Sequence, residues 1–189
     1  MSLSITIELS DTDLDHFQTV LKRTTDAAVG KSAAEITEAA MKLLGSAKTD
    51  NVPEFIASRL SKLKALIDMV HDEGWNMSAE DKARVLSALS YFAEEQDVIP
   101  DDVPVVGYLD DAIMIELCVR ELKHELDAFI DFCDFRSNEA ANRGLDIATV
   151  GRQDWLDGRR LELHERMQRR RERDGYTNSF GGRGLFRFG

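Results

Sequence analysis

Apolar and polar positions repeat with the period of an α-helix along most of the chain. In the strongest case, six apolar side chains recur at spacings of 4, 3, 4, 3 and 4 residues. These spacings place all six on one face of a helix. The six residues are Ile115, Val119, Leu122, Leu126, Phe129 and Cys133. This stripe predicts a long helix that faces the core and lies at the centre of a helical bundle.

Start and stop signals divide the rest of the chain into further helices. A serine stands three residues before an acidic residue at Ser10, Ser32 and Ser78, a spacing typical of a helix capping box. Pro53 suits the first turn of another helix, and an arginine-rich segment at 152–173 predicts the last one. The sequence therefore predicts an all-α fold, a bundle of about six helices.

The two ends of the chain differ from this pattern. Residues 3–9 alternate between apolar and polar, which is the period of a strand. We expect this short strand-like segment to lie extended on the helices, although pairing with the same segment of a second copy is an alternative. Residues 175–189 are rich in Gly, Phe and Arg and predict a flexible tail. We therefore expect a single helical domain at 1–174 followed by the tail.

The charge of the chain is large and unevenly distributed. Its 189 residues, 43% hydrophobic, carry a net charge of −11. Residues 1–149 hold 14 Lys/Arg and 29 Asp/Glu, a balance of −15, whereas residues 150–189 hold 10 Arg and 6 Asp/Glu, a balance of +4. The acidic body argues against nucleic-acid binding. The contrast between body and tail points to a protein partner or a homo-oligomer.

The cysteines and the absence of long apolar runs bear on the compartment. Cys118 and Cys133 lie on one predicted helix about 22 Å apart, too far for a disulfide. Two reduced thiols fit a cytoplasmic protein. No apolar run approaches the roughly 20 residues of a transmembrane helix, and the N-terminus lacks the features of a signal peptide. We expect a cytoplasmic protein, with peripheral contact to the inner membrane as an alternative.

Two short motifs resemble functional sites but have simpler explanations. The run from Val29 to Ser32 ends like a phosphate-binding loop, yet it is better explained as a helix-ending glycine followed by an N-cap serine. Glu121 and His124 have the spacing of a di-iron bundle motif, but the required second copy is missing and we expect them on a solvated face. No catalytic residue is assigned, which favours a protein that is not an enzyme.

The segment 97–111 is the best candidate for function. Pro100 and Pro104 make it a stiff, non-helical connector between two helices. Five carboxylates could hold Mg²⁺ or Ca²⁺, which prefer oxygen ligands. They belong to Asp97, Asp101, Asp102, Asp110 and Asp111.

A structural role explains much of the same chemistry, and it is our leading interpretation. Asp110 and Asp111 fall in the first turn of the next helix, where negative charge is stabilised by the helix dipole. Gly107 allows a close backbone approach just before that helix, and Asp101 or Asp102 can complete a turn after Pro100. On this interpretation no cofactor is expected.

Arginines cluster near the end of the last predicted helix. They are Arg166, Arg169, Arg170, Arg171 and Arg173. Such a cluster could contact RNA or an anionic membrane. Acidic residues are interleaved with it, so a solvated helix end with cations near its C-terminal dipole is the favoured explanation.

The connector also carries a family resemblance. Tyr91 and Phe92 precede an Asp-x-Ile-Pro-Asp run that is followed by Pro104, Gly107 and an Asp-Asp pair. From Tyr91 to Asp111 this pattern resembles the YkvA-like family, a bacterial domain of unknown function, over about residues 85–125. Glu94, Glu95 and Gln96 depart from the apolar approach seen in many members, which weakens any inference of membrane contact. The resemblance implies no reaction.

Together these features predict a non-enzymatic helical interaction or scaffold module that uses an acidic Pro/Asp motif. The first alternative is a divalent-cation site on the same aspartates, with hydrolysis as one role. The second is membrane or RNA contact through the arginine-rich end.

Overall fold

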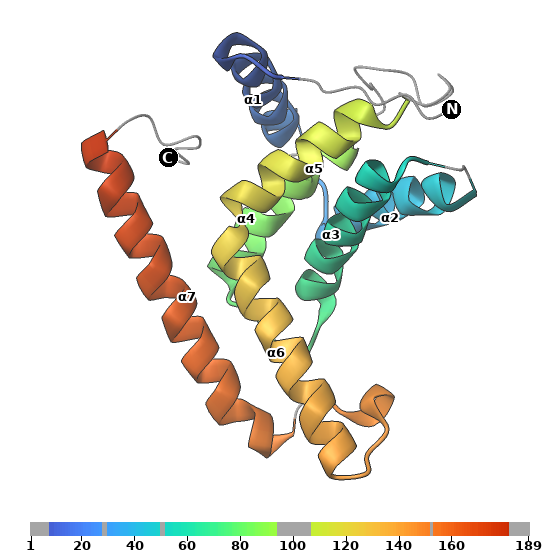
Figure 1. Ribbon diagram of the computed structural model, residues 1–189, viewed down its shortest axis with the longest axis vertical. Coiled ribbons are helices and arrows are strands. Elements are labelled where there is room, and N and C mark those ends of the chain that lie inside the picture. The colour runs from blue at the N-terminus through green and yellow to red at the C-terminus, as the bar shows by residue number, and fades with distance from the viewer. Residues whose placement is uncertain (1–7, 28–29, 50–51, 94–106, 152, 182–189) are drawn as a thin grey trace.

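The computed structural model of the protein describes residues 8–27, 30–49, 52–93, 107–151 and 153–181, with side chains except at 27, 48, 49 and 176–181. Over these residues the fold is all-α, without strands (Figure 1). The predicted fold class is confirmed. The elements are α1 (Asp11–Ala27), α2 (Ala33–Thr49), α3 (Glu54–His71), α4 (Ala79–Leu89), the 3₁₀ helix η1 (Ser90–Ala93), α5 (Leu109–Glu121), α6 (Lys123–Asn142), the 3₁₀ helix η2 (Ile147–Thr149) and α7 (Asp154–Gly181).

Local capping explains where three of these helices begin. The hydroxyl and amide of Ser10 both donate to Asp13 Oδ2, at 2.7 and 2.9 Å. These bonds hold the pKa of the Asp13 carboxyl below its usual value. Ser32 donates to Glu35 in the same way, at 2.6 and 2.7 Å, and the Ser78 hydroxyl accepts from the Asp81 amide at 3.0 Å. All three predicted caps are confirmed.

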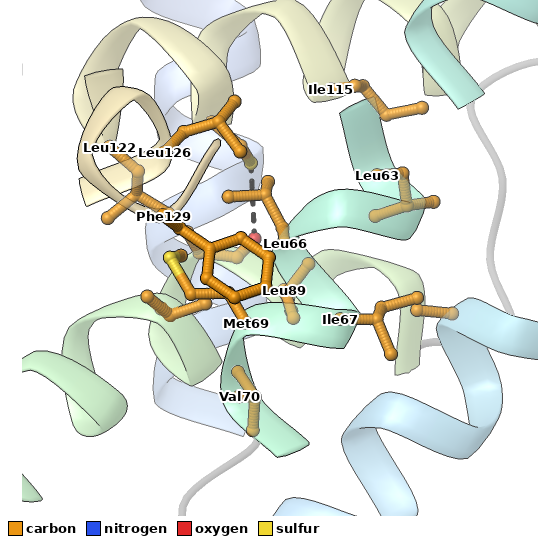
Figure 2. Close-up of a cluster of buried hydrophobic side chains, with 14 of the residues drawn as sticks. Leu63, Leu66, Ile67, Met69, Val70, Leu89, Ile115, Leu122, Leu126 and Phe129 are labelled. Atoms are coloured by element: carbon orange, nitrogen blue, oxygen red, sulfur yellow. Dashed lines mark hydrogen bonds between the residues drawn. The ribbon is translucent and has the colours of Figure 1, made fainter. Parts of the chain in front are cut away.

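The core lies where α3, α4, α5 and α6 meet (Figure 2). Leu63, Leu66 and Met69 of α3 are fully buried there, together with Leu89 of α4 and Ile115 of α5. The predicted stripe also faces this core, although Val119 and Cys133 are only partly buried. The thiol of Cys118 donates to the Ala88 carbonyl at 3.2 Å, and burial raises its pKa to about 12. Both cysteines are free.

The stripe belongs to two helices rather than the single helix predicted. Leu122 separates α5 from α6, with φ −98° and ψ 21°. Its amide still donates to the Cys118 carbonyl at 2.9 Å, and its carbonyl still accepts from the Leu126 amide at 2.9 Å. Residues 118–126 contain neither proline nor glycine, so no local stop signal marks this break. Leu122 itself stays buried in the core.

The last helix packs on α6 and stands at one side of the molecule (Figure 1). It continues to Gly181, so the prediction that it ends near Arg173 was wrong. The added residues 174–181 include Asp, Gly, Thr, Asn and Ser, which are weak helix formers, so local propensity does not explain the extension. The rest of the predicted tail and the strand-like residues 1–7 lie outside the described residues.

The connection between α3 and α4 is held by both C-terminal helices. Arg136 of α6 donates to both carboxylate oxygens of Asp72, at 3.0 and 2.7 Å, and the Trp75 amide donates to Asp72 Oδ1. The His164 ring of α7 stacks on Trp75 with ring centroids 4.1 Å apart. Gly74 lies between these groups, where an added Cβ would meet the Gly151 carbonyl oxygen at 2.8 Å. The connection therefore has little free space.

None of the helices within the described ranges is long and apolar enough to cross a bilayer.

Candidate functional site

The carboxylates of Asp110 and Asp111 lie inside the protein. Both residues fall in the first turn of α5, as predicted, and they are only 1% and 4% exposed. The hydroxyl of Tyr91, a buried residue of η1, donates to Asp110 Oδ2 at 3.3 Å. Buried carboxylates require hydrogen bonds or opposite charges, because burial disfavours the charged form. This end of the motif is thus part of the interior rather than an acidic surface.

The remainder of the motif is only partly described. Gly107 lies buried in the turn just before α5. Asp97, Pro100, Asp101, Asp102 and Pro104 lie outside the described residues. The structure therefore describes only the consecutive Asp110 and Asp111 of the five aspartates, and a five-carboxylate site remains a prediction.

Within the described ranges, no group of three or more His, Cys, Asp or Glu side chains is arranged to hold a metal ion. Asp110 and Asp111 make only a pair. A cation site on this motif would need ligands from 97–102.

A charged cluster between α4, α6 and α7 escaped the sequence prediction. Glu125 of α6 is fully buried, and its Oε1 lies 3.4 Å from Arg84 of α4 and 3.5 Å from Arg171 of α7. Arg171 also pairs with Asp81, and Arg84 also lies 3.6 Å from Glu121. Burial raises the pKa of the Glu121 carboxyl, while Arg84 acts in the opposite direction. The cluster holds three carboxylates and two guanidinium groups, which leaves a formal charge of −1.

The expectation that Glu121 and His124 face solvent was wrong. Arg84 lies over Glu121, and His124 Nε2 lies 2.7 Å from Asp174 Oδ2 of α7. This bond holds the pKa of Asp174 below its usual value. The error arises from tertiary packing, because α7 covers the face of α6 opposite the core stripe. The helical period alone does not reveal a second buried face.

The arginines of α7 mainly contact acidic groups of their own chain. Arg166 pairs with Asp131 of α6, and Arg171 is bound within the cluster described above. Arg169 lies 3.7 Å from Glu165, and Arg173 lies 3.6 Å from Asp174. Arg170 is half-buried. Two of the five predicted contact residues are thus committed to packing α7 on the body.

Two cavities flank the body and differ in chemistry. A polar cavity of about 400 Å³ lies between α4 and α7, and charged residues line most of it. An apolar groove of about 720 Å³ lies between α2 and α3, with Met41, Leu44 and Leu60 among its lining residues. Neither feature was predicted. The polar cavity forms only when α4 and α7, which are distant in sequence, pack together, and the groove depends on how the consecutive helices α2 and α3 meet.

Comparison with known proteins bears on one part of the chain. Residues 81–117 match the model of a family described as a protein of unknown function, DUF1232. No curated protein and no solved structure matches the chain. The matched segment starts at Asp81 of the charged cluster, includes Tyr91 and the connector, and ends within α5. Residues 81–117 of this chain therefore carry the DUF1232 pattern, with which the YkvA-like resemblance is consistent.

Proposed function

We propose that the protein is a non-enzymatic helical interaction module whose 97–111 connector binds a protein partner. One observation carries the proposal: Asp110 and Asp111 are buried in the first turn of α5, with Tyr91 hydrogen-bonded to Asp110. These two aspartates anchor the connector to the bundle. Asp101 and Asp102, between the two prolines, are then the acidic groups that meet the partner. Two free cysteines support a cytoplasmic location.

The test separates binding from stability by changing only the central aspartates. The full chain carrying Asp101→Asn and Asp102→Asn is compared with wild type as bait in an affinity capture, and any captured protein is purified and titrated against both. The control carries Asp11→Asn and Asp15→Asn, which removes two exposed charges from α1. We expect the titrated affinity to fall at least about tenfold in the 101/102 variant only, with unchanged Tm, since lost charge pairs weaken binding. Equal affinity for all three chains, or a large fall in Tm, would contradict the proposal.

A divalent-cation site is the second candidate, and the burial of two adjacent carboxylates favours it. Hard cations stabilise carboxylates that have left water. Asp97, Asp101 and Asp102 would have to complete such a site. Titration calorimetry with Mg²⁺, Mn²⁺ and Ca²⁺ on wild type and Asp110→Asn distinguishes the two candidates. Heat that disappears in the variant supports a cation site, whereas no heat and no thermal shift at millimolar metal removes it.

Contact with RNA or a membrane through α7 has less support. Arg166 and Arg171 already pair with Asp131, Asp81 and Glu125. An external anion would have to compete with these carboxylates.

A further inference from the structure

Helix α7 has two chemically distinct parts. Leu156, Leu163 and Met167 are buried against the body, at the spacing of one helix face. Residues 168–175 follow immediately and contain no apolar side chain, only Gln, Arg, Glu, Asp and Gly. We call residues 168–175 the strap. Its attachment cannot depend on hydrophobic burial by its own side chains.

Charged contacts hold the strap to the body. Arg171 reaches across to Asp81 of α4, and its Nε lies 3.5 Å from Glu125 Oε1 of α6. Near the end of the strap, His124 Nε2 lies 2.7 Å from Asp174 Oδ2. Gln168, Arg169, Glu172 and Arg173 are exposed. Arg171 is therefore the side chain that joins the strap to two other helices at once.

The polar cavity lies beneath this part of α7. Arg171, Gln168 and Glu172 line one side of it, and Ser78, Glu80, Asp81 and Arg84 line the other. Close apolar packing between α4 and the strap is absent from the described contacts, since the lining is mostly polar. Arg171 is partly exposed beside this cavity, although its partners Asp81 and Glu125 are buried, so salt screens these pairs in part. The buried apolar contacts of the first part of α7 are not screened by salt.

We propose that the strap is an ionic latch, which opens away from α4 near Met167 while the first part of α7 and the rest of the bundle stay folded. Local openings of this kind need less free energy than global unfolding. The opened strap leaves Asp81, Glu121 and Glu125 facing Arg84 alone. The inference is independent of the proposed function of the connector.

Hydrogen exchange on the full chain tests the latch. In wild type, raising NaCl from 0.05 to 1 M shortens the screening length from over 10 Å to about 3 Å. We expect the amides of 170–175 to exchange at least about threefold faster at the higher salt, because Arg171 and Asp174 are partly exposed and salt weakens their charge pairs. The amides of 156–167 and of α3 should change less than about twofold. This salt comparison uses the wild-type protein, so a misfolded variant cannot account for its result.

A matched pair of variants identifies the latch residue. Arg171→Ala should accelerate exchange of 170–175 by about tenfold or more, the loss expected for a charge-assisted hydrogen bond. Arg169→Ala is the control, because Arg169 is exposed and pairs with Glu165 along its own helix. This variant should change the exchange rate of 170–175 less than about twofold. The latch is overturned if salt leaves 170–175 unchanged, or if Arg171→Ala accelerates 156–167 as much as 170–175.

Discussion

At the scale of single residues, the unexpected feature is a set of acidic side chains that lie inside the protein. Asp110, Asp111 and Glu125 are almost completely buried, although the chain has ample surface for charges. The Tyr91 hydroxyl compensates Asp110, and two arginines compensate Glu125. Removing one member of such a set lowers the free energy of unfolding by more than the whole set contributes to it, because the remaining charged group stays buried.

Glu121 provides a pH test of the charged cluster. Its folded-state pKa is raised, mainly by burial. The stability that it contributes is therefore fully present below its usual pKa and is lost as the pH rises through the raised value. We expect the Tm of Glu121→Gln, relative to wild type, to increase between pH 4 and pH 7, as measured by thermal unfolding. Glu38→Gln, an exposed change on α2, controls for the loss of one negative charge. A relative Tm that falls over this range would show that attraction to Arg84 outweighs desolvation.

At the scale of elements, the sequence predicts what depends on neighbours along the chain. The three serine caps and the core stripe were confirmed because capping and helical periodicity are local. The break at Leu122 and the face of α6 that receives α7 could not be predicted, because both depend on packing between distant segments. The same limit explains why Arg171 was proposed as a contact for an external anion, although its partners lie 46 to 90 residues away in its own chain.

Two glycine substitutions test the tight connection between α3 and α4. Gly74→Ala places Cβ 2.8 Å from the Gly151 carbonyl oxygen and 3.0 Å from Arg136. Relieving this contact requires the backbone at Gly151 to shift, so we expect a loss of about 1–3 kcal/mol in the free energy of unfolding. Gly45→Ala, inside α2, meets nothing within 4 Å and should stabilise by about 0.5–1 kcal/mol. Denaturant unfolding measures both, and an equal effect at the two sites would contradict the packing described for the connection.

At the scale of the whole molecule, the uneven charge of the chain has an internal use. Arginines of α7 pair with acidic residues of α4 and α6, namely Arg166 with Asp131 and Arg171 with Asp81 and Glu125. The charge difference between residues 1–149 and 150–189, which suggested an external partner, therefore contributes in part to packing within the chain. The proposed partner contact is assigned to the connector, which lies within the 81–117 segment that matches the family model.

If the connector consists of a buried anchor and a separate binding segment, substitutions in the two parts should differ in their effect on the free energy of unfolding. Denaturant unfolding of Asp110→Ala is compared with that of Asp101→Ala in the full chain. We predict that Asp110→Ala costs about 1–3 kcal/mol, because the buried Tyr91 hydroxyl loses an acceptor. Asp101→Ala should stay within about 0.5 kcal/mol of wild type, because the proposal gives Asp101 a role in binding and none in stability. Equal losses in the two variants, or no loss in Asp110→Ala, would contradict the account.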